Sequence, residues 1–268
     1  MALRPLILMT NDDGINSPGL HAAVEAVADL GELLILAPTF QQTGAGRSHP
    51  ASSDKTIYAT EILIDERSYP AYRVDASPAQ AVALAVNHLA NRPIDLCVSG
   101  INYGENLGSG VTISGTVGAA LDAACHGIPS LAVSLETPQE YHLSHSKDID
   151  FTTAAYFVSE FVKKTLSKGH PPGVDLLKID IPATATPQTE WRTASISRQR
   201  YYDLAHHPHN SFSEVENKME VIRKIAEPGS DVYVFAIERR VSVVPMTIDL
   251  TARVSLRDVN QFFARSVR

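Results

Sequence analysis

The chain has 268 residues, which is long enough to bury a substantial hydrophobic core. Hydrophobic residues make up 44% of it and charged residues 20%, so the composition is that of an ordinary globular protein. The formal net charge of −7 argues against a nucleic-acid polymer as the partner, because binding a phosphate backbone requires a basic surface. No apolar run approaches the roughly 20 residues of a membrane span, so we expect no membrane partner either.

Two further features bear on the cellular compartment. The N-terminal stretch MALRPLILMTNDDG is too short, and becomes acidic too soon, to be a signal peptide. Cys97 and Cys125 both lie in apolar segments, and we interpret them as reduced core residues rather than as disulfide partners or metal ligands. We therefore expect a cytoplasmic protein.

The first half of the chain alternates between predicted strands and helices. Leu6–Met9 and Leu33–Leu36 are short continuous apolar runs, typical of parallel strands that are covered on both faces. Between them, Pro18–Leu30 has apolar residues at helical spacing and is followed by a glycine that suits a helix end. A polar loop, Thr39–Asp54, then precedes a β-like region over Lys55–Val74.

A second helix is predicted to begin at Ser77-Pro78, because serine can cap a helix and proline fits its first turn. The elements that we expect next are a strand Asp95–Val98, a long loop Ser99–Ser114, a helix Thr116–His126, a strand Ser130–Ser134, a helix Ala154–Leu166 and a strand Leu176–Ile181.

The periodicity becomes less regular after Ile181, although Val232–Ile237 and Val241–Val244 suit strands. We expect a single domain over residues 1–268, with an α/β core to about residue 185 and a C-terminal extension over about 186–268.

Three predicted loops follow strand ends, where open α/β sheets bind their ligands. The first loop places Asp12 next to Asp13, and two adjacent carboxylates repel each other unless a cation or a shared proton relieves them. A divalent metal in an oxygen-rich site is the simplest relief. The alternative is that one aspartate caps the following helix and the other is solvated.

The second loop, APTFQQTGAGRS, offers the hydroxyl of Thr43 to a metal and glycines that let backbone N–H groups approach a phosphate. It is not a P-loop, because the G-x-x-x-x-G-K-[ST] pattern is absent, and a simple surface loop is the alternative. Arg47 in this loop is either a substrate clamp or part of a salt bridge.

The third loop begins with Asn102, whose amide oxygen can face a metal or a substrate. It ends with Ser114-Gly115-Thr116, which opens a helix whose free N–H groups and positive dipole end would hold an anion. The two hydroxyls can instead serve only as caps. Taken together, a divalent cation beside a helix N-terminus predicts a pocket for a phosphate monoester.

The runs TNDDG, AP…TGAGRS, SGINYGENLG and SGTVGAA resemble the signature blocks of the SurE family, the stationary-phase survival protein E family. The resemblance extends from Leu6 to about Leu135 and continues more faintly to Asp249-Leu250-Thr251. It implies a Rossmann-like, three-layer α/β/α sandwich whose C-terminal extension exchanges elements in a homodimer or homotetramer. It also implies a metal-dependent phosphatase that hydrolyses nucleoside 5′- and 3′-monophosphates, with short polyphosphate as a further substrate of some members.

The resemblance also assigns residues. It places one Mg²⁺ or Mn²⁺ ion on Asp12, Asp13, Thr43 and Asn102, where Thr43 replaces the usual serine, and LKIDIP at Leu177–Pro182 replaces an asparagine-bearing run. The residues expected to face the phosphate are Asn11, Gly46, Ser114, Gly115 and Thr116.

The expected mechanism is attack by a metal-activated water, with the less tightly coordinated of Asp12 and Asp13 as general base. An aspartyl-phosphate intermediate is the chemical alternative. A non-enzymatic nucleotide-binding or sensory module is the functional alternative, although no G-x-G-x-x-G follows the first strand.

The histidines suggest no site from the sequence alone. We interpret His206, His207 and His209 as solvated or interfacial residues, and His142 and His145 in the same way.

Overall fold

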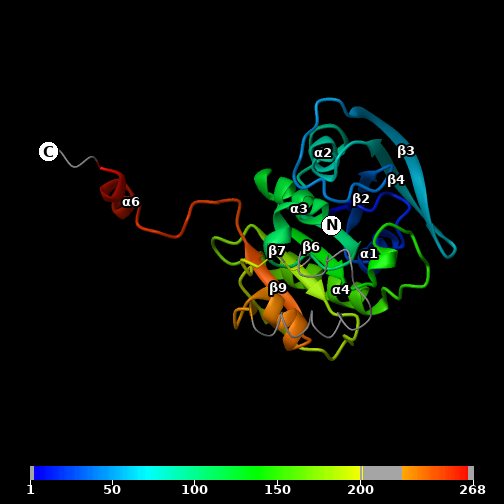
Figure 1. Cartoon of the computed structure of the whole chain (residues 1–268). Coiled ribbons are helices and arrows are strands. Elements are labelled where there is room, and N and C mark those ends of the chain that lie inside the picture. Colours follow the sequence, from blue (N-terminus) through cyan, green and yellow to red (C-terminus); the bar gives the residue numbers. More distant parts are fainter. Residues whose placement is uncertain (1–2, 200, 202–224, 265–268) are drawn as a thin grey trace.

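The computed structural model describes residues 3–199, 201 and 225–264. Among these residues, nine strands form one sheet in the order β3-β4-β2-β1-β5-β6-β7-β9-β8 (Figure 1). Neighbours from β4 to β7 pair in parallel, whereas β3 and β9 run antiparallel to β4 and β7. The strands are β1 Leu6–Thr10, β2 Glu32–Pro38, β3 Asp54–Ile64, β4 Arg67–Asp75, β5 Leu96–Tyr103, β6 Ser130–Leu135, β7 Leu176–Ile181, β8 Trp191–Thr193 and β9 Val241–Met246.

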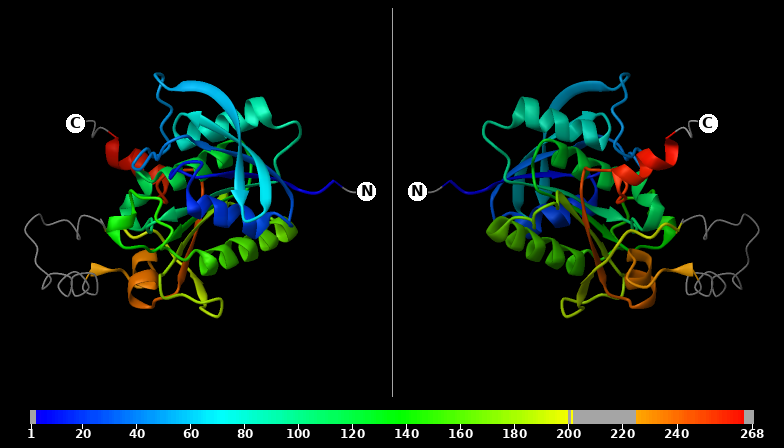
Figure 2. Two further views of the ribbon diagram at one scale, coloured as in Figure 1. Left: turned by 90° about the vertical axis from the view of Figure 1, so that its right-hand side faces the viewer. Right: turned by 90° about the vertical axis from the view of Figure 1, so that its left-hand side faces the viewer.

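Helices cover both faces of this sheet, and Figure 2 shows α2 and α4 on opposite sides of it. One face packs against α1 (Pro18–Val27) and α4 (Thr152–Lys168), and the other against α2 (Pro78–Leu84) and α3 (Gly115–Cys125). Strand β1 serves both layers because successive side chains of a strand point to opposite faces: Ile7 and Met9 join the α1–α4 core, and Leu6 and Leu8 join the α2–α3 core. The predicted Rossmann-like, three-layer α/β fold is confirmed.

The start of α2 shows how local sequence sets an element. The hydroxyl of Ser77 accepts a hydrogen bond from the backbone N–H of Gln80 at 3.1 Å, and the side chain of Gln80 accepts one from the backbone N–H of Ser77 at 3.2 Å. This reciprocal capping box follows directly from the predicted Ser-Pro start. The helix continues into a π-helical turn, η1 (Ala85–Leu89).

Two predictions about the elements are wrong in part. The helix predicted over Pro18–Leu30 ends at Val27. Residues Ser99–Tyr103, predicted as loop, belong to β5, because pairing with β6 continues past an irregularity between Ser99 and Asn102. Burial in a central strand here outweighs a composition that favours turns.

The predicted strand Val232–Ile237 is also wrong, because Tyr233–Ile237 is the π-helical turn η4. Phe235 and Ala236 of this turn, with Val232 just before it, pack in one cluster with the buried Leu107. A short apolar run does not distinguish a strand from a buried helical segment, and only the tertiary partner decides. The nearby prediction for Val241–Val244 is confirmed, since these residues form most of β9.

The two cysteines have different surroundings. Both are free, as predicted, and Cys97 is buried, whereas Cys125 is exposed at the end of α3, so the expectation that it is a core residue is wrong. Among the residues that the structure describes, none of the helices combines the length and the apolar character needed to cross a membrane.

The segment beyond residue 185 supplies both β8 and β9 to the central sheet. After β9 the chain leaves the body of the molecule and ends in an isolated helix, α6 (Leu256–Phe263), as Figure 1 shows. Every described residue from Ile248 to Ala264, which we call the C-terminal arm, is exposed. The arm carries Leu250, Phe262 and Phe263 at 90%, 82% and 77% exposure.

Candidate active site

The turn after β1 presents the two aspartates at the carboxyl edge of the sheet. Asn11 fixes this turn, because its side-chain amide donates to the carbonyl of Gly14 and its side-chain oxygen accepts from the N–H of Gly14, both at 3.1 Å. Gly14 has φ +100°, a conformation that glycine adopts without steric cost. Asn11 therefore contributes to the site by fixing the backbone of the turn that carries the two aspartates.

Asp13 points into the protein. Its Oδ1 accepts a hydrogen bond from Nε2 of Gln41 at 2.9 Å, and its Oδ2 accepts one from the backbone N–H of Tyr103 at 3.2 Å. Only 1% of Asp13 is exposed. Burial raises the pKa of Asp13 well above its ordinary value, and the neighbouring charge of Asp12 raises it further.

Asp12 faces a cavity and the start of α3. Its Oδ1 accepts a 2.5 Å hydrogen bond from the hydroxyl of Thr116. Burial raises the pKa of Asp12 to about 6, although the hydrogen bonds from Thr116 oppose the rise. Two buried carboxylates side by side are electrostatically costly, and a cation relieves that cost.

The first turn of α3 fits closely around Asp12. Ser114 caps the helix, with its hydroxyl accepting a hydrogen bond from the N–H of Val117 at 3.1 Å. A Cβ atom at Gly115 would lie 2.7 Å from both Cβ and Oδ2 of Asp12. Glycine at this position therefore lets the carboxylate approach the positive end of the helix dipole.

The loop after β2 packs onto the same helix. The N–H of Gly46 donates to the carbonyl of Ile113 at 3.0 Å, and a Cβ atom at Gly118 would lie only 2.2 Å from the carbonyl oxygen of Gly46. Nε of Arg47 contacts Oδ1 of Asp122 at 3.0 Å, so Arg47 forms the salt bridge that was one of its two predicted roles. These contacts hold Thr43 beside the cavity.

Asn102 reaches the same cavity from the end of β5. Its Nδ2 donates to the carbonyl of Gly104 at 2.6 Å, which leaves the amide oxygen as the atom that can coordinate a cation. The cavity has a volume of about 360 Å³. Its lining includes Asp12, Thr43, Asn102 and Ser114 together with Gly44, Tyr103, Glu105, Asn106, Gly110, Ile113 and His142.

All nine predicted site residues therefore gather at one edge of the sheet, but they do not play equal parts. Four of them line the cavity. The other five, Asn11, Asp13, Gly46, Gly115 and Thr116, support it from behind through the contacts described above.

The donor set suits a hard divalent cation. Two carboxylates, one hydroxyl and one amide oxygen are the ligand types that Mg²⁺ and Mn²⁺ prefer. Within the described part of the chain, no group of three or more His, Cys, Asp or Glu side chains could hold a metal ion. A cation at this site would therefore depend on the acidic pair supplemented by neutral oxygens.

Sequence reasoning missed two histidines at the site. His142 lines the cavity, and Nε2 of His145 lies 2.8 Å from the backbone oxygen of Asp13. Both belong to the loop after β6, which, like the other three loops, follows the carboxyl end of a parallel strand. That placement was the signal that could have found them. The cluster His206, His207 and His209 lies outside the described residues.

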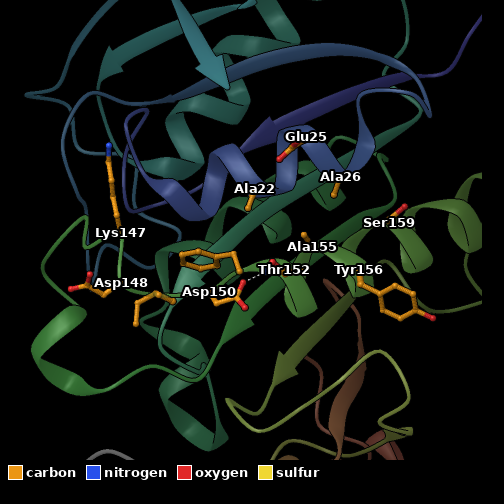
Figure 3. A pocket seen from close by; sticks show the side chains of 12 residues that line it. Ala22, Glu25, Ala26, Lys147, Asp148, Asp150, Thr152, Ala155, Tyr156 and Ser159 are labelled. Atoms are coloured by element: carbon orange, nitrogen blue, oxygen red, sulfur yellow. Dashed lines mark hydrogen bonds between the residues drawn. The ribbon is translucent and has the colours of Figure 1, made fainter. Parts of the chain in front are cut away.

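A larger cavity of about 770 Å³ lies elsewhere, between α1 and the start of α4 (Figure 3). Ala22 and Ala26 of α1 and Ala155 of α4 line it, with Lys147 and Asp150 from the loop before α4. It contains none of the nine predicted site residues, so its size alone does not mark it as the active site.

The fold and this site define a class: an α/β protein with a Rossmann-like sheet and an acidic cavity at the carboxyl ends of its strands. The model of the SurE family, "Survival protein SurE", matches residues 7–203. The chain therefore belongs to the SurE family.

Individual relatives agree. A protein of Thermococcus kodakarensis named 5′-nucleotidase SurE is 40% identical over 262 residues, covering 95% of this chain and 97% of that protein. One of Methanothermobacter thermautotrophicus with the same name is 44% identical over 181 residues, covering 66% and 68% of the two chains. The crystal structure of the Sure protein from Aquifex aeolicus aligns with a TM-score of 0.71 at 28% identity, covering 96% of this chain and 99% of that chain.

Proposed function

We propose that this protein is a divalent-metal-dependent phosphatase that hydrolyses nucleoside 5′- and 3′-monophosphates to nucleoside and phosphate, with short polyphosphate as a further substrate. The relatives named 5′-nucleotidase SurE support a nucleotidase. The observation that carries the proposal is the adjacent buried pair Asp12 and Asp13, of which Asp12 lines the cavity and lies against the N-terminus of α3.

Asp12, Asp13, Thr43 and Asn102 would hold one Mg²⁺ or Mn²⁺ ion. When bound, such an ion polarises phosphoryl oxygens and lowers the pKa of a coordinated water. The positive end of α3 at Ser114 and Gly115 favours the phosphate group beside it.

The two aspartates have separate roles in this proposal. Asp13 is held on both oxygens by Gln41 and Tyr103, so it serves as a fixed anchor. Asp12 lines the cavity and is the carboxylate that can reach an attacking water, so we assign it the role of general base. Thr116 orients Asp12 through its hydroxyl.

The test is a hydrolysis assay with a panel of nucleoside 5′- and 3′-monophosphates and polyphosphate, run with Mg²⁺, with Mn²⁺ and with EDTA. Wild-type protein should release phosphate only with a divalent ion. Asp12→Asn should reduce kcat by about 10²- to 10⁴-fold, the usual contribution of a general base. Asp29→Asn, an exposed change in the turn after α1, is the control and should leave turnover unchanged.

Full activity in both Asp12→Asn and Asp13→Asn would refute the site. Nucleotide binding without phosphate release would favour the alternative of a non-enzymatic module. Reduction of an aspartate by borohydride during turnover would replace the water mechanism by an aspartyl-phosphate intermediate.

We also propose that the protein is a cytoplasmic homodimer or homotetramer in which subunits exchange the C-terminal arm. The support is the exposed apolar surface of the arm, which finds no partner on the body of its own subunit among the described residues.

A further inference from the structure

A fully buried charge cluster lies behind the cavity. Lys178 and Asp180 lie on β7, and Asp231 comes just before η4; all three have 0% exposure. Nζ of Lys178 donates to Oδ2 of Asp180 and lies 3.1 Å from Oδ2 of Asp231. Burial alone would lower the pKa of Lys178, but the two carboxylates outweigh it and raise the pKa, so the lysine is charged.

The two carboxylates also hold a short stretch of backbone, Asn106–Gly108, which we call the clamped segment. Oδ1 of Asp180 accepts the N–H of Asn106 at 2.7 Å, and Oδ2 of Asp231 accepts the N–H of Gly108 at 3.1 Å. Leu107 between them is fully buried. The two ends of the clamped segment are thus held by Asp180 and Asp231, and Lys178 forms an ion pair with both of these carboxylates.

The clamped segment forms part of the proposed active site. Asn106 lines the cavity, and its Nδ2 donates to the hydroxyl of Ser134 at 2.8 Å. The segment also joins the end of β5, which carries Asn102, to the turn that leads into Ser114. A shift of the clamped segment would therefore move one wall of the cavity.

We propose that Lys178, Asp180 and Asp231 are positioning residues that hold the Asn106 wall of the cavity in place for the substrate. Buried ion clusters can often be replaced by apolar side chains of similar volume without loss of stability. What this cluster provides, and an apolar replacement would lack, is two acceptors for the N–H groups of Asn106 and Gly108. The inference rests on the proposed function, because it takes this cavity as the substrate site.

Two double variants of the full-length, Mn²⁺-loaded protein test the proposal. Both carry Lys178→Met, which removes the ammonium, and they differ only at Asp180. In one, Asp180→Asn keeps an acceptor for the N–H of Asn106; in the other, Asp180→Leu has a similar shape but no acceptor. In both variants Asp231 still accepts hydrogen bonds from the backbone N–H groups of Gly108, Ser197 and Val232.

The measurements are thermal stability, backbone hydrogen exchange at the clamped segment, Mn²⁺ affinity and steady-state kinetics with a nucleoside monophosphate. The Met/Leu variant should unfold at a lower temperature than the Met/Asn variant, because the buried N–H of Asn106 loses its acceptor. It should exchange faster at Asn106 and show a kcat/KM lower by about 10- to 100-fold, as when a supporting hydrogen bond is lost. Mn²⁺ affinity should be the same in both, because the metal ligands lie on other segments.

Equal rates of hydrogen exchange at Asn106 in the two variants would overturn the proposal. If the wild type is active, equal kcat/KM values for the two variants would also overturn it. Rapid exchange at Asn106 and Gly108 in the wild type would overturn it even if neither variant folds. An inactive wild type would refute the proposed function instead, and the exchange comparison would then still decide whether the cluster holds the segment.

Discussion

At the scale of single residues, Asp12 and Asp13 are neighbours in the chain with opposite environments. Asp13 lies between Gln41 and Tyr103, whereas Asp12 lies between the cavity and Thr116. Both lie in the turn after β1, where Asp13 is held by Gln41 and Tyr103 and Asp12 lies against the first turn of α3. One aspartate can therefore be fixed while the other faces the ligand.

Thr116→Val tests how Asp12 is oriented. Valine has nearly the shape of threonine but no hydroxyl, so Asp12 loses its 2.5 Å hydrogen bond while the helix stays packed. We expect kcat to fall by about 10- to 100-fold, as for other groups that orient a metal ligand. Thr165→Val at a buried position of α4 is the matched control. Equal rates for both variants would contradict the role of Thr116.

The metal-free protein should lose stability as the pH rises. The pKa of Asp12 is about 6 in the folded protein against 3.8 as its ordinary value, so between these values the folded state holds a proton that the unfolded chain releases. The free energy of unfolding then falls by roughly 3 kcal/mol as the pH rises from below 4 to above 6. The raised pKa of Asp13 extends the loss to higher pH.

Urea unfolding of EDTA-treated protein at pH 5 and pH 8 measures the part of this loss that falls above pH 5, together with the contribution of Asp13. Mn²⁺ added at pH 8 should restore stability, because the ion binds the ionised carboxylates of the folded state. In Asp12→Asn, the free energy of unfolding of the metal-free protein should depend less on pH. Stability of the metal-free wild type that stays constant or increases between these two pH values would show that the acidic pair is not strained.

At the scale of elements, the site depends on how closely α3 approaches the end of β1. Gly115 allows this approach, since a Cβ atom there would lie 2.7 Å from Oδ2 of Asp12. The loop after β2 also packs closely against α3, since a Cβ atom at Gly118 would lie 2.2 Å from the carbonyl oxygen of Gly46. The glycines of the SGTVGAA block thus serve packing between elements.

Gly115→Ala should abolish most activity while leaving α3 helical. Alanine favours a helix more than glycine does, so any loss of turnover comes from displacement of Asp12. Gly127→Ala, just beyond the other end of the same helix, is the control: φ is +76° there, so stability falls by roughly 1 kcal/mol, but no atom lies within 4 Å of the new Cβ. Circular dichroism and kcat for the two variants separate the effects.

Elements with a local signal were predictable. The Ser-Pro start of α2 and the apolar run of β1 were both found, because capping and burial patterns are written in neighbouring residues. The end of β5 and the helical turn η4 were missed, because β6 and Leu107 decide their conformation.

At the scale of the whole molecule, the C-terminal arm is the feature that does not pack against the rest of the described chain. It leaves β9, extends away from the body in Figure 1, and exposes Leu250, Phe262 and Phe263. In the proposed assembly, a second subunit would cover these exposed apolar side chains.

Deletion of residues 250–268 should therefore reduce the oligomer to a smaller species. Size-exclusion chromatography with light scattering measures the mass directly. Full-length protein with Phe262→Ser and Phe263→Ser should show the same shift if burial of these rings drives association. A deletion variant with the mass of the wild-type assembly would exclude the arm as the exchanged element.

The proposed metal and phosphate residues could be named as candidates from the sequence because they follow strand ends and helix starts, which are local features. The residues that contact them, and so determine their roles, could not be named from the sequence. Thr116 bonds to Asp12 across 104 positions, and His145 contacts Asp13 from a loop that looked unremarkable. The link between Lys178 and Asp231 likewise joins distant segments.

The sequence by itself determined which kinds of group stand at the carboxyl ends of the strands, since hydrophobic periodicity and turn chemistry depend on adjacent residues. Only the tertiary structure decided which aspartate faces the cavity, which hydroxyl supports it and which buried charges hold its wall. Those roles depend on distances between segments far apart in the chain, and such distances are set when the sheet and its two helix layers pack together.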